Sequence, residues 1–295
     1  MRLLILFLLV SLSAQSQTSS PLSRETCLQR IDSIFSRQKG VFALAFKDLS
    51  TGRQLFIHEH ESFHAASTMK TPVMIEIYRQ VGQGRLRLSD SIVLKNEFTS
   101  IVDTSHYSLS PDDDSEPDLY RHPGERRSIS DLLGLMITVS SNFATNLLVE
   151  QAGPANIAAT LHQLGADEIH VLRGVEDEKA FQAGLNNTVT AAGLAQIFEK
   201  MAKGEAVSPA ASDAMIRILL DQHYNEIIPA LLPAGTRVAH KTGWIKGINH
   251  DSGIVFLPDG RKYVLVLLSK QTEDDKAAIA AMAEVSRLIY EYVTQ

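Results

Sequence analysis

The segment Ser67-Thr68-Met69-Lys70 places a hydroxyl group and an amine three residues apart. At the start of a helix, residues at this spacing lie on the same face, one turn from each other. A serine hydroxyl is a poor nucleophile near neutral pH and needs an adjacent base, which lysine becomes when burial and neighbouring positive charge favour loss of its proton. The spacing predicts a nucleophile, Ser67, with Lys70 as its base, although the tetrapeptide alone is a weak signal.

Two later segments strengthen this prediction. The sequence SSN at residues 140–142 lies between an apolar run and a helix-like segment, where a serine is most often a helix cap. The sequence HKTGW at residues 240–244 lies on an expected strand, where a lysine alone would be solvated and a glycine alone would mark a bulge. Taken together and in this order, the three segments match the pattern of serine β-lactamases and penicillin-binding proteins.

The chain resembles the class A β-lactamase family and its close relatives among the penicillin-binding proteins. The resemblance covers about residues 22–295, in the order of the elements as well as in the motifs. Residues 63–70 are similar to the family's approach to its nucleophile, and residues 138–148 to the stretch around its second motif. The resemblance implies a hydrolase that opens β-lactam rings, a small-molecule substrate, through an acyl-enzyme on Ser67, with no cofactor and no metal.

The resemblance also implies a role for each residue of the first two motifs. Ser67 would attack the lactam or peptide carbonyl, and Lys70 is a candidate for the base that takes its proton. Ser140 would pass that proton to the leaving nitrogen, and Asn142 would hydrogen-bond the amide side chain of the substrate. Ser141 stands where aspartate is common in the family. Because that aspartate is mostly structural, we expect altered local support and retained activity.

The third motif is expected to bind the substrate. By the same resemblance, Lys241 and Thr242 would receive the substrate carboxylate, one by charge and one by its hydroxyl. Gly243 has no side chain and would let the substrate lie against the strand. The backbone N–H groups of Ser67 and Trp244 would form the oxyanion hole, in which each donor contributes roughly 3 kcal/mol.

The chain departs from the family between residues 174 and 187. Class A β-lactamases carry there a glutamate, in a Glu-x-x-Leu-Asn pattern, that activates the water that removes the acyl group. This chain reads GVEDEK at residues 174–179, and Glu176 falls within one residue of the expected place. Glu176 is therefore the candidate deacylating residue, although three consecutive acids more often form a solvated turn. Slow deacylation would instead make the protein a penicillin-binding DD-peptidase that acts on peptidoglycan stem peptides.

Several other patterns in the sequence could indicate a different site or function. The sequence HESFH at residues 60–64 formally matches a zinc protease motif, but we expect it to lie on an irregular connection where the histidines point apart. His240 and His250-Asp251 are expected at the edge of a strand pair, and the acidic residues 112–114 in a solvated loop. A non-catalytic penicillin sensor usually needs a membrane link or an output domain, and neither is evident.

The order of the expected elements indicates the fold. We predict helices at about residues 23–37, 67–81, 142–151, 155–164, 190–201, 208–220 and 273–290, with another from residue 129. Strands are predicted at residues 41–48, 54–58, 237–242, 253–257 and 262–269. Strands at both chain ends with helices between them predict an α+β fold, in which an antiparallel sheet flanked by helices adjoins a mostly helical second lobe. The sheet lobe would comprise about residues 22–66 and 232–295, and the helical lobe 67–231.

The N-terminus and the composition bear on location and partners. Arg2, the apolar run at residues 3–12 and the small residues after it predict a signal peptide over residues 1–16, too short to span a membrane. The remaining domain, 17–295, is expected to be secreted or periplasmic, monomeric and without a membrane anchor. The formal net charge of −6 argues against nucleic acid as a partner. Cys27, the single cysteine, is expected to be a structural thiol on a helix.

Overall fold

The computed structural model describes residues 22–295. The predicted signal peptide at residues 1–16, and the first residues of the predicted domain, lie outside the described residues. Within residues 22–295, no helix combines the length and the apolar character that crossing a membrane requires.

A five-stranded antiparallel sheet is built from both ends of the chain, in the order β2-β1-β11-β10-β9. Its strands are β1 (Val41–Asp48), β2 (Gln54–Ile57), β9 (Arg237–Ile245), β10 (Ile248–Phe256) and β11 (Lys262–Lys270). The two halves meet where β1 pairs with β11, from Val41 opposite Lys270 to Asp48 opposite Tyr263. The α+β fold class and the antiparallel sheet predicted from the sequence are confirmed.

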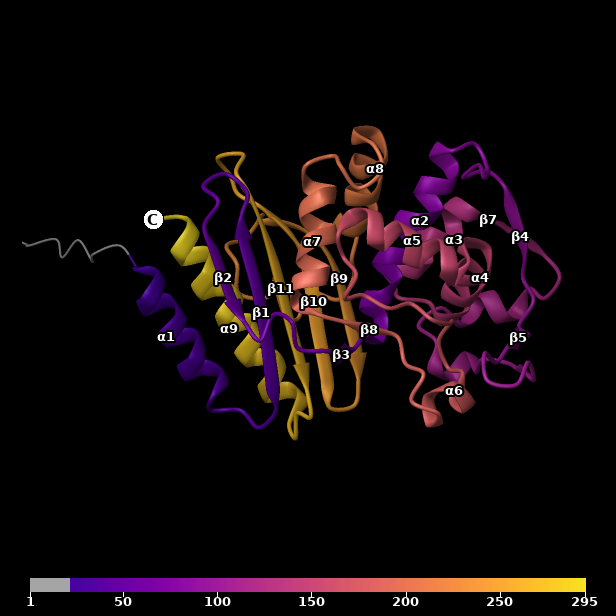
Figure 1. Ribbon diagram of the computed structural model, residues 1–295, viewed down its shortest axis with the longest axis horizontal. Coiled ribbons are helices and arrows are strands. Elements are labelled where there is room, and N and C mark those ends of the chain that lie inside the picture. The colour runs from indigo at the N-terminus through magenta and orange to yellow at the C-terminus, as the bar shows by residue number, and fades with distance from the viewer. Residues whose placement is uncertain (1–21) are drawn as a thin grey trace, which may run out of the picture.

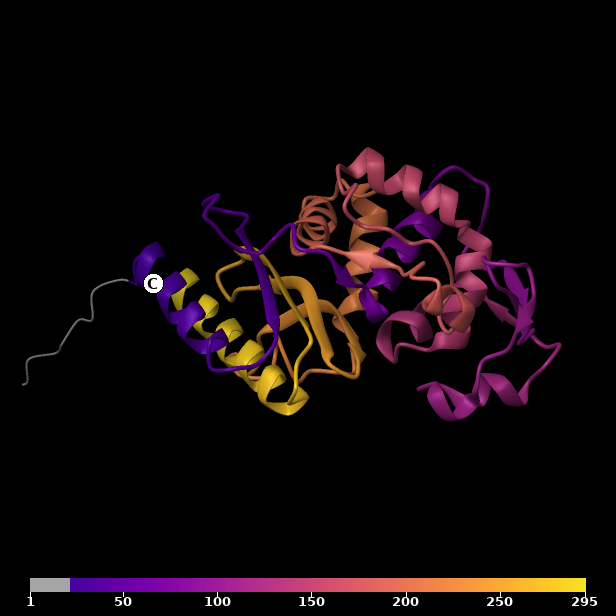
Figure 2. The ribbon, with the colours of Figure 1, turned by 60° about the horizontal axis from the view of Figure 1, so that its bottom comes forward.

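Alternation along the strands gives the sheet two buried faces. Phe42, Leu44 and Phe46 pack in a cluster with α1 (Arg24–Phe35) and α9 (Asp275–Val293). The intervening alanines, Ala43 and Ala45, belong to the cluster that contains α7 (Ala191–Ala202) and the other helices. Figure 1 shows α1 and α9 at one end of the molecule and the helical region at the other, and Figure 2 shows α1 and α9 side by side against the sheet.

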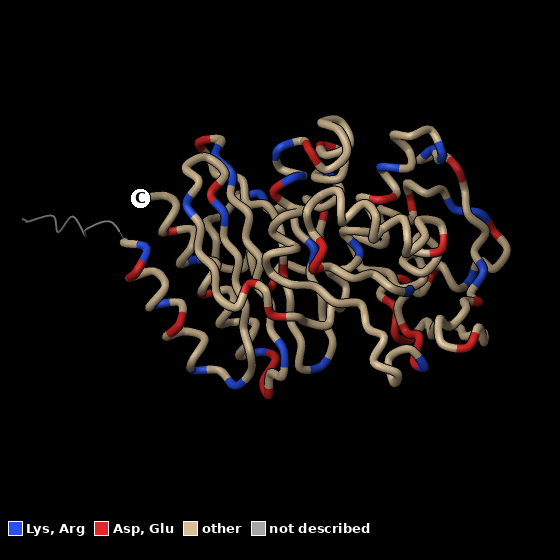
Figure 3. Tube along the Cα trace, in the orientation of Figure 1, with Lys and Arg blue, Asp and Glu red and all other residues tan. Residues whose placement is uncertain are grey.

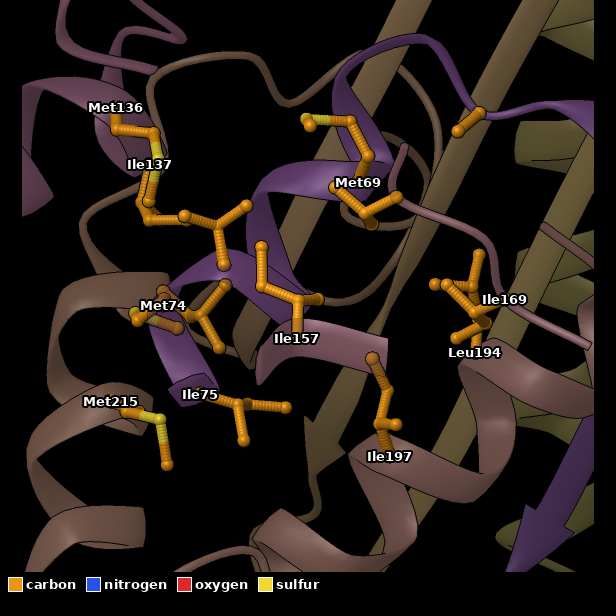
Figure 4. Close-up of a cluster of buried hydrophobic side chains, with 14 of the residues drawn as sticks. Met69, Met74, Ile75, Met136, Ile137, Ile157, Ile169, Leu194, Ile197 and Met215 are labelled. Carbon is orange, nitrogen blue, oxygen red and sulfur yellow. The ribbon is translucent and has the colours of Figure 1, made fainter. Parts of the chain in front are cut away.

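The helical region surrounds a buried central helix, α2 (Lys70–Gly82), in which ten of 13 residues are buried. Because its apolar residues cover more than one face, it can pack against several helices at once. Figure 4 shows Met69, Met74 and Ile75 among side chains from the surrounding helices. These neighbours are α3 (Ile129–Thr138), α4 (Asn142–Ala152), α5 (Pro154–Leu164), α7 and α8 (Pro209–Leu220).

The remaining elements are short. Residues 22–295 include the 3-10 helices η1 (Ala66–Met69), η2 (Pro111–Asp113) and η3 (Pro117–Arg121), and the small helix α6 (Glu178–Gln182). The minor strands are β3 (Phe63–His64), β4 (Ser91–Val93), β5 (Phe98–Thr99), β6 (His106–Tyr107), β7 (Arg126–Ser128) and β8 (Thr188–Val189). Figure 3 shows acidic and basic residues interspersed over both ends of the described molecule.

Three predicted elements differ from the structure. The helix predicted from residue 67 begins as the 3-10 turn η1, and the α-helix starts at Lys70, with Pro72 in its first turn as expected. β10 begins at Ile248, not at residue 253 as predicted. Residues 249–252 are polar and so gave no sign of a strand in the sequence, but they are fully buried in the sheet. The stretch 174–187 contains α6, which is too short to show a helical period.

Candidate active site

Ser67 lies in η1, directly before α2. The residue before it, Ala66, has φ +44°, a left-handed conformation that non-glycine residues rarely adopt. Hydrogen bonds hold the turn on both sides: Ala66 N donates to His64 Nδ1 at 3.1 Å, and Thr68 Oγ1 donates to Ala65 O at 2.6 Å. Strained backbone of this kind persists where the surroundings over-determine it, and it clusters at active sites.

Lys70 is the first residue of α2, and its side chain is fully buried. Its Nζ donates to Ser140 O at 2.7 Å and to Asn142 Oδ1 at 2.9 Å, and it lies 3.1 Å from Ser140 Oγ. Burial lowers the pKa of Lys70 to about 7, although the nearby carboxylates of Asp114 and Glu176 favour its charged form. Lys70 is thus an amine that readily gives up its proton near neutral pH.

Lys241, which lies on a strand of the sheet, contacts Ser140 as Lys70 does. Alternation along β9 puts Ala239, Lys241 and Gly243 on the face that packs against η1 and the helical region. Lys241 Nζ donates to Ser140 Oγ at 3.1 Å and to Thr242 O at 2.9 Å. Burial, and then the charge of Lys70, lower the pKa of Lys241 well below its ordinary value. The hydroxyl of Ser140 therefore lies between two buried amines.

The turn before α4 presents the second motif. Ser140 has φ +64°, so its backbone is also left-handed. Ser141 is the N-cap of α4, and its Oγ accepts from Ala144 N at 3.2 Å. Asn142 uses both ends of its amide, since Oδ1 accepts from Lys70 and Nδ2 donates to Glu176 Oε1 at 2.7 Å. Ser141 is thus the helix cap expected in this motif. Ser140 contacts Lys70, and Asn142 contacts both Lys70 and Glu176.

Gly243 lies directly against the turn that carries Ser67. A Cβ atom at position 243 would lie 3.0 Å from Ser67 N and 3.1 Å from Thr68 N, so a side chain there would push the strand and this turn apart. Trp244 follows with 63% of its surface exposed. A cleft of about 380 Å³ opens here, and its lining includes Ser67, Ser140, Thr242 and Gly243.

Glu176 lines a second cavity beside Ser67. It has φ +62°, and a cavity of about 440 Å³ is lined by Ser67, Asn142, Glu176 and Trp244 among others. Desolvation by the surrounding protein raises the pKa of Glu176, with the carboxylates of the acidic run adding to the rise, while the hydrogen bond from Asn142 and the charge of Lys70 oppose it. The structure therefore brings this glutamate to the same cavity as Ser67.

The segments on either side of Glu176 are fixed to different parts of the helical region. Val175 N donates to Asn146 Oδ1 at 2.6 Å, and Val175 O accepts from Asn146 Nδ2 at 3.1 Å. The buried carboxylate of Asp177 accepts from Ser100 Oγ at 2.9 Å and from Ile101 N at 3.0 Å. The resemblance over residues 138–148 includes Asn146 but gave it no supporting role, and no motif marks Asp177, so sequence reasoning missed both contacts.

Two predictions about charged residues were wrong. Asp114, which we placed in a solvated loop, is buried and accepts from Phe143 N at 2.7 Å. His250, which we placed at the edge of a strand pair, is buried in the interior strand β10, whereas His240 lies in the edge strand β9 and is also buried. His240 Nδ1 lies 2.8 Å from Asp251 Oδ1, and Asp251 Oδ2 accepts from Ile228 N at 3.0 Å. These polar groups could be buried because each has a partner.

The HESFH segment does not form a helical zinc motif. His64 lies in β3 and His60 in a turn, where His60 Nδ1 is 2.7 Å from Glu168 Oε1. Across residues 22–295, no three His, Cys, Asp or Glu side chains are grouped closely enough to hold a metal ion. Cys27 lies buried in α1, as predicted, and burial raises the pKa of its thiol to about 11.

The fold and motifs have relatives among known proteins. A family model described as the β-lactamase enzyme family matches residues 27–293. The extended-spectrum β-lactamase PER-1 of Pseudomonas aeruginosa is 27% identical, over 97% of this chain and 92% of that protein. A β-lactamase from Sphaerobacter thermophilus has a similar fold, with a TM-score of 0.78 at 24% identity over 91% of this chain and 97% of that chain. A mutant of PBP-A, solved as an acyl-enzyme complex with penicillin G, has a TM-score of 0.77 at 27% identity over 92% of this chain and 98% of that chain.

Proposed function

The chain belongs to the β-lactamase enzyme family, and on this premise we propose that it is a secreted serine hydrolase that opens β-lactam rings through an acyl-enzyme on Ser67. The observation that carries the proposal is the position of Ser140 Oγ, 3.1 Å from the buried amines of both Lys70 and Lys241. A serine hydroxyl in this position can relay a proton between a base and a leaving group.

Acylation then proceeds in three proton transfers. The neutral amine of Lys70 takes the proton of Ser67 as Oγ attacks the lactam carbonyl carbon. The carbon–nitrogen bond of the ring breaks, and Ser140 gives its proton to the departing nitrogen while it takes from Lys70 the proton that came from Ser67, which leaves Lys70 neutral again. The lowered pKa of Lys70, about 7, supports its role as the base, because a base works best when its pKa is near the working pH.

The third motif would hold the substrate during these steps. Lys241 and Thr242 would bind the substrate carboxylate, and the backbone N–H groups of Ser67 and Trp244 would bind the developing oxyanion. The close contact of Gly243 with Ser67 N supports this arrangement, because it brings the strand beside the nucleophile. Asn142 would orient the amide side chain of the acyl group.

Glu176 would complete the cycle by removing the acyl group. A carboxylate on the cavity that Ser67 lines can accept a proton from a water molecule as that water attacks the acyl carbon. The water's oxygen bonds to the carbonyl carbon, the bond to Ser67 Oγ breaks, and the serine oxygen receives the proton that Glu176 took from the water, which returns Glu176 to its carboxylate form. The contact between Asn142 Nδ2 and Glu176 Oε1 supports this assignment, because Asn142 also contacts Lys70.

The rate of acylation is expected to rise with pH and to reach half its maximum near pH 7. The neutral form of Lys70 is the active base, and it predominates above the pKa of about 7. Stopped-flow measurement of the acylation step alone, between about pH 5 and pH 9, separates this ionisation from that of Glu176. A flat profile over that range would exclude Lys70 as the base.

Export would follow from the N-terminal segment. We infer that residues 1–16 direct the chain out of the cytoplasm and are then removed, since a charged residue, an apolar run and small residues occur there in that order. The expected product is a periplasmic or secreted protein whose intact mass corresponds to residues 17–295. A mass that still includes residues 1–16 would contradict the cleavage.

The activity is tested by a chromogenic cephalosporin assay combined with intact-mass spectrometry of the same sample. Sustained turnover with little adduct is the result expected of a β-lactamase. A stable adduct on Ser67 without turnover would favour the alternative, a penicillin-binding DD-peptidase acting on peptidoglycan stem peptides. The absence of both adduct and turnover would reject the two functions together.

A further inference from the structure

One residue of the acidic run, Asp114, is buried beneath the turn that carries Ser140 and Asn142. It lies between η2 and η3, while its neighbours Asp112 and Asp113 are exposed. Burying a carboxylate is unfavourable unless it is paired and hydrogen-bonded. The buried carboxylate of Asp114 therefore needs hydrogen-bond donors around it.

The carboxylate of Asp114 has four hydrogen-bond donors. Oδ2 accepts from Phe143 N at 2.7 Å, from Tyr120 Oη at 2.8 Å and from Ser141 Oγ at 3.3 Å, and Oδ1 accepts from Glu116 N at 3.0 Å. Two of these donors, Ser141 and Phe143, flank Asn142 on both sides. Asp114 thus holds the residues on either side of the asparagine that contacts Lys70, Ser141 by its hydroxyl and Phe143 by its backbone N–H.

The same carboxylate also stabilises the start of α4. Ser141 Oγ accepts from Ala144 N, which leaves Phe143 N as a further free donor of the first turn, and Asp114 takes it from outside the helix. A negative charge at a helix N-terminus is favourable. The neighbouring residue of the loop adds a further contact, since Ser115 Oγ donates to Val139 O.

We propose that Asp114 is a positioning residue of the active site, which supplies from a separate loop the carboxylate that fixes the turn of residues 140–142 and, through it, the amine of Lys70. The inference rests on the proposed function. Ser141 stands where the resemblance leads us to expect aspartate, and its hydroxyl donates to Asp114. The motif itself therefore has no carboxylate at position 141, and the loop packed against it supplies one instead.

Charge gives Asp114 a second effect on Lys70. The charged groups that face this amine are Asp114, Glu176 and Lys241. The two carboxylates favour the protonated form of Lys70, against burial, and so keep its pKa from falling further. Removal of the charge at position 114 should therefore lower the pKa of Lys70 and move the acid limb of the acylation profile to lower pH.

The test compares Asp114→Asn and Asp114→Ala with the matched control Asp112→Asn, which removes an exposed charge two residues away. We expect kcat/KM to fall by about 10- to 100-fold in both Asp114 variants, because displaced catalytic groups cost rates of this size. In Asp114→Asn the acid limb should also move down by about one pH unit. A folded Asp114→Asn variant with unchanged kcat/KM and an unmoved limb would overturn the inference.

Two variants that place a carboxylate at position 141, with and without the one at position 114, distinguish a positioning role from a general effect on stability. Ser141→Asp alone places two carboxylates in contact and should lower activity, whereas Ser141→Asp combined with Asp114→Ala should recover most of the kcat/KM lost in Asp114→Ala. Failure of the double variant to recover activity would contradict the proposed role, even if the single alanine variant does not fold.

A substrate-free measurement separates this inference from the proposed function. NMR titration of the Lys70 side chain should give a lower pKa in Asp114→Asn than in the wild type. If the wild-type protein formed no adduct with a cephalosporin, the proposed function would fail, and the titration would still decide whether Asp114 controls the amine. An unchanged Lys70 titration would refute that control.

Discussion

The Ser67→Ala variant is expected to lose β-lactam hydrolysis almost completely, with a fall in kcat of about 10⁶-fold. Ser67 is the proposed nucleophile, and its backbone N–H belongs to the proposed oxyanion hole. The alanine variant keeps the N–H and removes only the attacking oxygen. Residual binding without chemistry is the expected behaviour, so intact-mass spectrometry with excess cephalosporin should detect no covalent adduct.

A matched serine nearby serves as the control for this result. Ser62 is exposed on the same approach to η1, and Ser62→Ala removes a hydroxyl without altering the cleft. Its hydrolysis rate and its adduct mass should equal those of the wild type. An adduct that forms as fast on Ser67→Ala as on the wild type would place the nucleophile elsewhere.

Replacement of Glu176 by glutamine is expected to trap the acyl-enzyme. Glutamine keeps the shape of the side chain and an oxygen that can accept from Asn142 Nδ2, but it cannot take a proton from water. Loss of a general base lowers a rate by about 10²- to 10⁴-fold. Acylation, which uses Lys70, should continue, so the burst of product should approach one equivalent while steady turnover falls.

Glu178→Gln is the control for this variant, because Glu178 belongs to the same run and lines the same cavity but accepts from Gln182 Nε2, whereas Glu176 accepts from Asn142 Nδ2. Its turnover should match the wild type, and its adduct should not accumulate. Unchanged hydrolysis in Glu176→Gln would remove Glu176 from the mechanism. Trapping in both variants alike would instead point to a general effect of charge in this loop.

The sequence predicted the helices and strands accurately wherever an apolar periodic pattern continued over many residues. The strands β1 and β11 and the helices α4, α5, α7 and α8 lie within two residues of their predicted bounds. β10 was predicted too short because its first half is polar, and burial of that half depends on partners in other strands, such as Ser269 Oγ, which donates to Asn249 O at 2.9 Å. A single sequence does not reveal such pairings.

The same limit applies to the candidate site. Ser67, Lys70, Ser140 and Lys241 could be proposed from motif spacing, since each motif is local and the order of motifs is distinctive. Asp114 could not, because its four donors come from residues 116, 120, 141 and 143 and nothing in an acidic run tells a buried member from an exposed one. Long-range polar contacts of this kind become visible only in three dimensions.

The pairing of β1 with β11 joins residues more than 200 positions apart, and this has a consequence for how the enzyme matures. Contacts between distant parts of a chain slow folding, since a long loop must close before they form. Lys241 and Gly243 both come from β9, which is synthesised after the helical region, so the cleft cannot exist in a fragment that ends before β9. The chain therefore becomes active only after its two ends have met.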